Sequence, residues 1–362
     1  MKNSKLFKVT ALAMAMLLLV FSLGFGVLAE SRASKQTGIR TEEEAQEYVR
    51  QYAAEISAGK SEYSVTGTQR LGSFSENKAY VLYTLSPLGY AVYDAASGVV
   101  EEMMLDCENP YAGVLKGELY YGGPMNYIRM VGGKYFMVAD GTELSKADVK
   151  RIREVEAAGM ERREAVKGVP TTTQYAYMTS SNYFTKQLGD RFGTNTNGTC
   201  VQIASAIMLG FYDRYVNDQF VPTEYEDSDS THHGTTEDFH QLLQTYMGTG
   251  NCSFNQAVSG LNSYFDSIYF SEPTARAEGG EYSTVFERVS SNVSGNKPTV
   301  IGMFKSYNSD CTMNHAVVAY GYRAEMSGGA MTSAAYFVHT GLKNQKLGTF
   351  AWDWFAADLY IG

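Results

Sequence analysis

A cysteine at the start of an expected helix is the residue best placed to act as a nucleophile. Cys200 follows a polar, glycine-bearing turn in the stretch NGTCVQIASAIMLGFYD. The apolar stripe of that helix falls on later residues, among them Ile203, Ile207 and Phe211. A sulfur at a helix N-terminus faces unpaired N–H groups and the positive end of the helix dipole, which favour the thiolate. Because the thiolate attacks carbonyl carbon, we predict a nucleophile here rather than a core cysteine.

A histidine at the head of an apolar segment is the candidate base. His315 begins HAVVAYGY, whose alternation predicts a strand, and the segment 297–303 (KPTVIGM) is expected to pair with it. A structural histidine is the alternative. His315 would be a polar side chain at the first inward position of a buried hairpin, and accepting the thiol proton would explain why it is there. A cysteine on a helix and a histidine on a strand are the arrangement of a thiol hydrolase.

Two further roles have candidates of lower specificity. His339 ends the expected strand 335–339 and could orient the imidazole of His315, and Asn344, five residues on, competes for that role. An oxyanion donor is expected before the nucleophile, beside the backbone N–H of Cys200 itself. Gln187 is the nearest upstream glutamine, although an exposed loop residue would look the same in sequence.

Spacing of the other ligand-type residues argues against a metal. Three histidines lie within residues 232–240, and Cys252 and Cys311 follow, but none shows the H-E-x-x-H or C-x-x-C spacing of zinc sites. The acidic run 224–230 (EYEDSDS) lacks the glycine and the final glutamate of an EF-hand loop, which leaves calcium a minor alternative. We expect no metal and no cofactor. Whether Cys252 and Cys311 form a disulfide stays open.

The N-terminal segment predicts export. Lys2, Lys5 and Lys8 precede an uncharged apolar run over 9–29, which ends in a small-residue cleavage site. Residues 1–29 are therefore read as a signal peptide, with an uncleaved membrane anchor as the alternative. Four cysteines are too few for a disulfide scaffold in so long an exported chain. We expect a secreted or cell-envelope protein, from a Gram-positive bacterium.

Charge and composition exclude some partners. Without the three lysines of the signal peptide, 27 basic residues stand against 39 acidic ones, and no basic stripe remains. Nucleic acid is therefore not an expected partner. Hydrophobic residues make up 44% of the chain and aromatic residues 13%, as in a folded protein. We expect a monomer that acts on a peptide or protein substrate.

Changes in periodicity divide the chain. Residues 30–40 are expected to be a linker. Residues 41–110 begin with an acidic, capped helix and continue with period-two segments around the hairpin 80–94, which predicts a small α+β module. Residues 111–170 hold short tyrosine-rich strands and a charged helix. Residues 171–362 place helices first and strands last, which is typical of the two-lobed papain-like layout.

The quoted motifs carry a family resemblance. NGTCVQIASAIMLGFYD resembles the nucleophile helix of secreted bacterial peptidases of the streptopain and bacteriocin-leader-processing families, and NKPTVIGM with NHAVVAYGY is similar to their paired strands. The resemblance covers about residues 171–362. It implies a papain-like fold, with Cys200 as nucleophile and His315 as base. His339 stands where these enzymes carry an orienting asparagine, a departure from their pattern.

The expected fold is α+β: a papain-like cysteine peptidase fold, with N-terminal helices and a C-terminal antiparallel sheet, preceded by the small α+β domain. Streptopain-like enzymes carry a prodomain that blocks the cleft, and residues 41–110 have the matching size and pattern. The resemblance thus implies a secreted cysteine endopeptidase, made as a zymogen, that forms an acyl-enzyme. Two alternatives remain: an inactive surface or adhesion binding module on the same fold, and a transglutaminase-like Cys-His acyltransferase.

Overall fold

The computed structural model describes residues 32–34, 41–57, 61–114, 117–164, 171–188, 198–226, 235–271, 273–303, 315–327, 330–342 and 347–362. The expected signal peptide and linker core, Asn344 and Cys311 lie outside these ranges. None of the helices in these ranges has the length and apolar character needed to cross a membrane.

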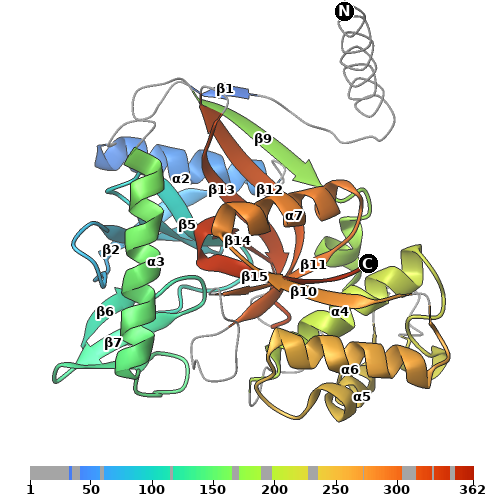
Figure 1. Cartoon of the computed structure of the whole chain (residues 1–362). Helices are drawn as coiled ribbons and strands as arrows, with labels where there is room; N and C mark the ends of the chain where they lie inside the picture. The colour runs from blue at the N-terminus through green and yellow to red at the C-terminus, as the bar shows by residue number, and fades with distance from the viewer. Residues whose placement is uncertain are drawn as a thin grey trace, which may run out of the picture.

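The protein is a mixed α+β structure built around one large antiparallel sheet (Figure 1). Its strands are β1 (Arg32–Ser34), β2 (Ser64–Arg70), β3 (Tyr80–Ser86), β4 (Tyr90–Asp94), β5 (Val99–Met104), β9 (Thr171–Tyr177), β10 (Ala275–Gly279), β11 (Thr299–Met303), β12 (Ala316–Ser327), β13 (Ala330–His339), β14 (Leu347–Ala351) and β15 (Phe355–Ile361). Their order is β10-β15-β11-β12-β13-β14-β5-β4-β3-β2, and β9 pairs with both β1 and β12. The sheet therefore draws strands from both ends of the chain.

The N-terminal half confirms the predicted helix and hairpin. Helix α2 (Glu42–Ile56) begins with a capping box between Thr41 and Glu44, and it buries one apolar stripe against β3, β4 and β5. A second sheet of β6 (Glu118–Tyr121), β7 (Tyr127–Val131) and β8 (Lys134–Met137) follows. Helix α3 (Lys146–Glu164), the charged helix expected from sequence, lies in front of this hairpin region (Figure 1).

The C-terminal half follows the predicted order of helices first and most strands last. Helix α4 (Cys200–Tyr215) packs with α5 (Glu237–Met247) and α6 (Phe254–Ser267), and α7 (Tyr282–Ser294) packs against β12 and β15. The expected pair 297–303 with 315–322 is confirmed as β11 beside β12, in which Ile301 lies opposite Val317.

The two halves share the large sheet, because β5 of the first pairs with β14 of the second, Met103 opposite Thr349. This pairing was not predicted. The module boundaries read from the sequence stay a prediction, and in the structure strands from 41–110 and from 171–362 lie edge to edge in one sheet.

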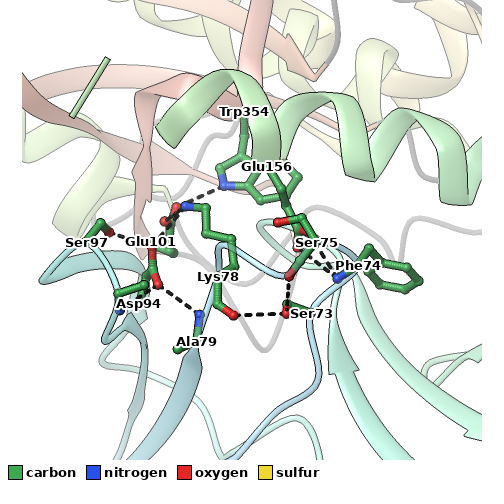
Figure 2. Close-up of polar contacts among 11 residues, drawn as sticks. Ser73, Phe74, Ser75, Lys78, Ala79, Asp94, Ser97, Glu101, Glu156 and Trp354 are labelled. Atoms are coloured by element: carbon green, nitrogen blue, oxygen red, sulfur yellow. Dashed lines mark hydrogen bonds and ion pairs between the residues drawn. The ribbon is translucent and has the colours of Figure 1, made fainter. Parts of the chain in front are cut away.

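A buried polar cluster accompanies this join (Figure 2). The Lys78 ammonium lies 2.7 Å from a Glu101 oxygen and 3.1 Å from an Asp94 oxygen, with all three side chains at most 2% exposed. The Trp354 indole N–H donates to the other Glu101 oxygen at 3.1 Å. Glu101 is the extra residue of a β-bulge, since Val92 pairs with Glu102 while Tyr93 pairs with Val100. The N-terminal half thus holds a tryptophan of the C-terminal half through a buried carboxylate.

Candidate active site

Cys200 is the first residue of α4, as predicted. The preceding Gly198 has φ +74°, a left-handed conformation that glycine adopts without steric cost, and it turns the chain into the helix. The thiol is reduced and the residue is only 5% exposed. Every residue of α4 from Cys200 to Tyr212 is buried, so the protein packs against this helix on all sides.

Two contacts fix the direction of α4 relative to β12. Near its start, Ile203 packs so close to Gly341 that a Cβ there would lie 2.6 Å from Ile203 Cγ2. Near its end, the Phe211 ring stacks on Phe184, and Phe184 stacks on Tyr320 of β12, with centroid separations of 5.5 Å and 5.2 Å. The helix therefore spans from the turn after β13 to the middle of β12.

Cys200 and His315 stand at the starts of these two packed elements. His339, the last residue of β13, pairs with Val318, so the chain that continues to Gly341 heads toward the first residue of β12. From there to Tyr320 the strand rises about 13 Å, and from Ile203 to Phe211 the helix rises about 12 Å. Helix α4 and strand β12 therefore run side by side in the same direction. Cys200 precedes the contacts on the helix, and His315 precedes them on the strand side.

His315 immediately precedes β12, and its carbonyl accepts a hydrogen bond from Met303 N, at the end of β11, at 3.2 Å. Its ring Nε2 is buried, and no residue in the described ranges hydrogen-bonds it. Burial lowers the pKa of His315 to about 4, because enclosure disfavours the charged imidazolium. The ring is therefore neutral near pH 7, which is the form that can accept a proton.

His339 is the last residue of β13, between Val318 of β12 and Leu347 of β14. Its Nδ1 accepts a hydrogen bond from Gly341 N at 3.1 Å, which ties the ring to its own turn. Burial lowers its pKa to about 4. It lies opposite Val318, which is three residues, or about 10 Å, along the strand from His315. Its orienting role stays a prediction, and its competitor Asn344 lies outside the described residues.

Gln187 ends the π-helical turn η1 (Tyr183–Gln187). This turn is anchored on α4, since the Tyr183 and Phe184 rings both pack against Phe211. The segment before Cys200 is thus held against α4, as an oxyanion donor for this cysteine would require. The role of Gln187 itself stays a prediction.

A loop that the sequence did not single out lies against the first turn of α4. Gln202, fully buried, donates from Nε2 to the carbonyls of Gly248 at 2.8 Å and Gly250 at 2.9 Å. The Asn251 carboxamide fills the space beside Gly198, where an added Cβ would lie 1.7 Å from its oxygen. The sequence signal was a glutamine inside an otherwise apolar helix.

The N-terminal half reaches the strand beside His315. The loop 122–126 packs Gly123 against the Trp354 indole, and the Asn126 amide lies 3.5 Å from Met303 Sδ. Met303 is the residue whose N–H bonds the His315 carbonyl. Met303 therefore links this loop to the backbone of His315, the candidate base.

Carboxylates offer one candidate cation site. Asp213, Asp218 and Glu226 have oxygens within 4.8 Å of one another, and this is the one such group among the residues that the structure describes. It lies near the far end of α4, about 20 Å along the helix from Cys200. Burial, and then the neighbouring carboxylates, raise the pKa of Asp213 to about 6. The group overlaps the acidic run 224–230 only at Glu226, and His232 and His233 lie outside the described residues.

Comparisons with known proteins add little to this geometry. No family profile and no curated protein matches the chain. Among solved structures, a mutant fragment of prointerpain A from Prevotella intermedia is similar at 13% identity and a TM-score of 0.37, covering 81% of this chain and 98% of the fragment. A likeness of this degree does not establish a shared fold.

Proposed function

We propose that the protein is a secreted, thiol-dependent peptide hydrolase with Cys200 as nucleophile and His315 as base, on a papain-like arrangement of helix and sheet. The observation that supports the proposal is the packing of α4 along β12, because Cys200 begins the helix and His315 immediately precedes the strand. The expected signal peptide supports action outside the cell or in its envelope.

The proposed reaction uses only groups of this chain and water. The neutral His315 imidazole accepts the Cys200 proton, and the thiolate sulfur attacks the peptide carbonyl carbon. The backbone N–H of Cys200, at the helix N-terminus, is directed at the oxygen on which charge develops. The imidazolium then gives its proton to the leaving amine. Water, deprotonated by His315, attacks the acyl-enzyme thioester and releases the acid and the thiol.

The N-terminal half is proposed to restrain this site until it is moved or removed. Its loop 122–126 contacts Met303, next to His315, and its Glu101 holds Trp354. Both contacts lie between the first 170 residues and the catalytic half. Deleting residues 30–145 should therefore raise the rate of hydrolysis per molecule of folded protein.

A thiol-reactive peptide electrophile tests the proposal. The full mature chain is treated with the probe, and each cysteine is quantified by mass spectrometry. We expect rapid, stoichiometric labelling at Cys200, slowed at least tenfold by His315→Ala, and little at Cys252. The matched control is Cys107→Ser, which removes another buried thiol and should change neither rate nor site.

Equal labelling of Cys200 and Cys252, or unchanged labelling in His315→Ala, would refute the catalytic pair. Labelling at Cys200 together with transfer of acyl groups to added amines, but no release of acid, would instead favour an acyltransferase.

A further inference from the structure

A second thiol that the proposed reaction does not use lies beside the start of α4. Cys252 is 2% exposed and reduced, and its Sγ–H donates to the Ser253 carbonyl at 3.2 Å. It immediately precedes α6, for which Ser253 is the N-cap. A buried cysteine away from any other thiol would need no explanation beyond packing.

The loop that carries Cys252 is fastened to the turn that carries Cys200. Asn251, the residue before Cys252, contacts Gly198, two residues before Cys200. On the other side, Gln202, two residues after Cys200, binds the carbonyls of Gly248 and Gly250. The loop that carries Cys252 therefore contacts the chain both before and after Cys200.

Electrostatics agree with this closeness. Burial is the main cause that raises the pKa of Cys252 to about 12, and charge on Cys200 raises it further. Coulomb coupling weakens as the separation of two groups grows, so this effect agrees with the contacts between the two segments. Cys252 thus stays protonated, and an oxidant that attacks thiolates reacts first at Cys200.

We propose that Cys200 and Cys252 form a reversible disulfide when a peroxide oxidises Cys200. The inference rests on the proposed function only in that Cys200 must be the reactive thiolate.

The chemistry balances with hydrogen peroxide as the oxidant. The Cys200 thiolate attacks one peroxide oxygen; the O–O bond breaks, an S–O bond forms, and hydroxide leaves. The Cys252 sulfur then attacks the Cys200 sulfur. The S–S bond forms as the S–O bond breaks, and the hydroxyl group leaves with the Cys252 proton as water. The two sulfurs lose two electrons to the peroxide, and an external thiol can return them.

This disulfide would both silence the nucleophile and protect it. While paired, Cys200 cannot attack a peptide, and it cannot be oxidised further to the sulfinic or sulfonic acid, which thiols do not reverse. An exported enzyme meets oxidants without the cytosolic reducing systems. Proximity of the two segments favours pairing over further oxidation, because the second thiol is held close by the fold.

The test compares the full mature wild-type chain with Cys252→Ser, whose hydroxyl can keep the hydrogen bond to Ser253. Each is treated with hydrogen peroxide, alkylated without reduction and mapped by mass spectrometry, and a second portion is then reduced with dithiothreitol. We expect a Cys200–Cys252 linked peptide in the wild type and at least 80% recovery of Cys200 labelling. In Cys252→Ser we expect sulfinic acid at Cys200 and recovery at least fivefold lower. Cys107→Ser is the matched control and should behave as the wild type.

Absence of the linked peptide, with equal recovery in both proteins, would overturn the proposal, as would a Cys252–Cys311 linkage in its place. Because the linkage is read by mass, its outcome does not depend on peptide hydrolysis. A linked peptide without hydrolysis sinks only the proposed function, and hydrolysis without the linked peptide sinks only the disulfide.

Discussion

Replacing Lys78 by methionine should destabilise the protein far more than replacing an exposed lysine that forms an ion pair of similar length. The Lys78 ammonium lies within 3.1 Å of both the Glu101 and the Asp94 carboxylates, whose side chains are fully enclosed. Methionine keeps the stem but leaves two buried carboxylates without that cation. Removing one partner of a buried ion pair costs about 3–5 kcal/mol.

The size of the expected shift in melting temperature follows from the chain length. The roughly 330 residues that follow the predicted signal peptide, at about 2.1 cal/mol/K each, give an unfolding entropy of about 0.7 kcal/mol/K. A loss of about 4 kcal/mol then lowers Tm by about 6 °C. The matched control is Lys134→Met, whose 2.9 Å ion pair with Glu143 is about half exposed on both sides. An exposed pair contributes about 0–1 kcal/mol, which corresponds to less than about 2 °C.

Differential scanning calorimetry and tryptophan fluorescence provide the assay, because Trp354 donates to Glu101 and so reports on the cluster itself. Adding Glu101→Gln to Lys78→Met removes one stranded charge and should recover part of the loss, so the two effects should not add. The reasoning is refuted if Lys78→Met and Lys134→Met shift Tm equally. Strict additivity of Lys78→Met and Glu101→Gln would show that the two side chains do not interact.

Two further predictions concern pH and backbone space. Burial, the main cause, raises the pKa of both Glu102 and Glu156 from 4.5 to about 7. A raised pKa in the folded state contributes stability that is complete below about pH 4.5 and is lost as the pH rises to about 7, about 3 kcal/mol for each group. The buried His315 and His339, whose pKa values are lowered to about 4, change stability in the opposite sense over this range, so the test compares the wild type with Glu102→Gln. In urea unfolding at pH 5 and 8, Glu102→Gln should lose less stability at pH 8 than the wild type does, and an equal loss in both proteins would count against the prediction. The second variant is Gly341→Ala, at φ +77°, whose new Cβ would lie 2.6 Å from Ile203 Cγ2. It should lower the unfolding free energy by about 1–3 kcal/mol more than Gly133→Ala, which has φ +78° but open space around it. Equal losses in the two variants would exclude steric crowding against α4 as the cause.

Local signals in the sequence were enough to place the individual elements. The acidic turn after Thr41 predicted α2, and the apolar stripe after Cys200 predicted α4. Alternation after His315 predicted β12 with its partner β11. These features depend on neighbours within a few residues, so composition and periodicity suffice to find them.

The relation between elements needed the structure. Pairing of β5 with β14 joins residues about 245 positions apart, and no local period encodes it. Glu101 and Glu102 interrupt an otherwise apolar strand. Their burial is explained by partners that are distant in sequence: Trp354 donates to Glu101, and the Tyr127 hydroxyl donates to Glu102. Likewise the polar character of His339 was visible, but its hydrogen bond to Gly341 N depends on the turn that follows.

The strand pairing between β5 and β14 has a consequence for any form of the protein that lacks its first half. With residues 41–110 gone, β14 would become an edge strand, and the N–H and C=O groups from Gly348 to Phe350 that face Glu102–Met104 would be open. An unprotected edge invites a strand from another molecule. A shortened protein would therefore have to cover this edge, with a second copy or a strand of another protein, or it would aggregate.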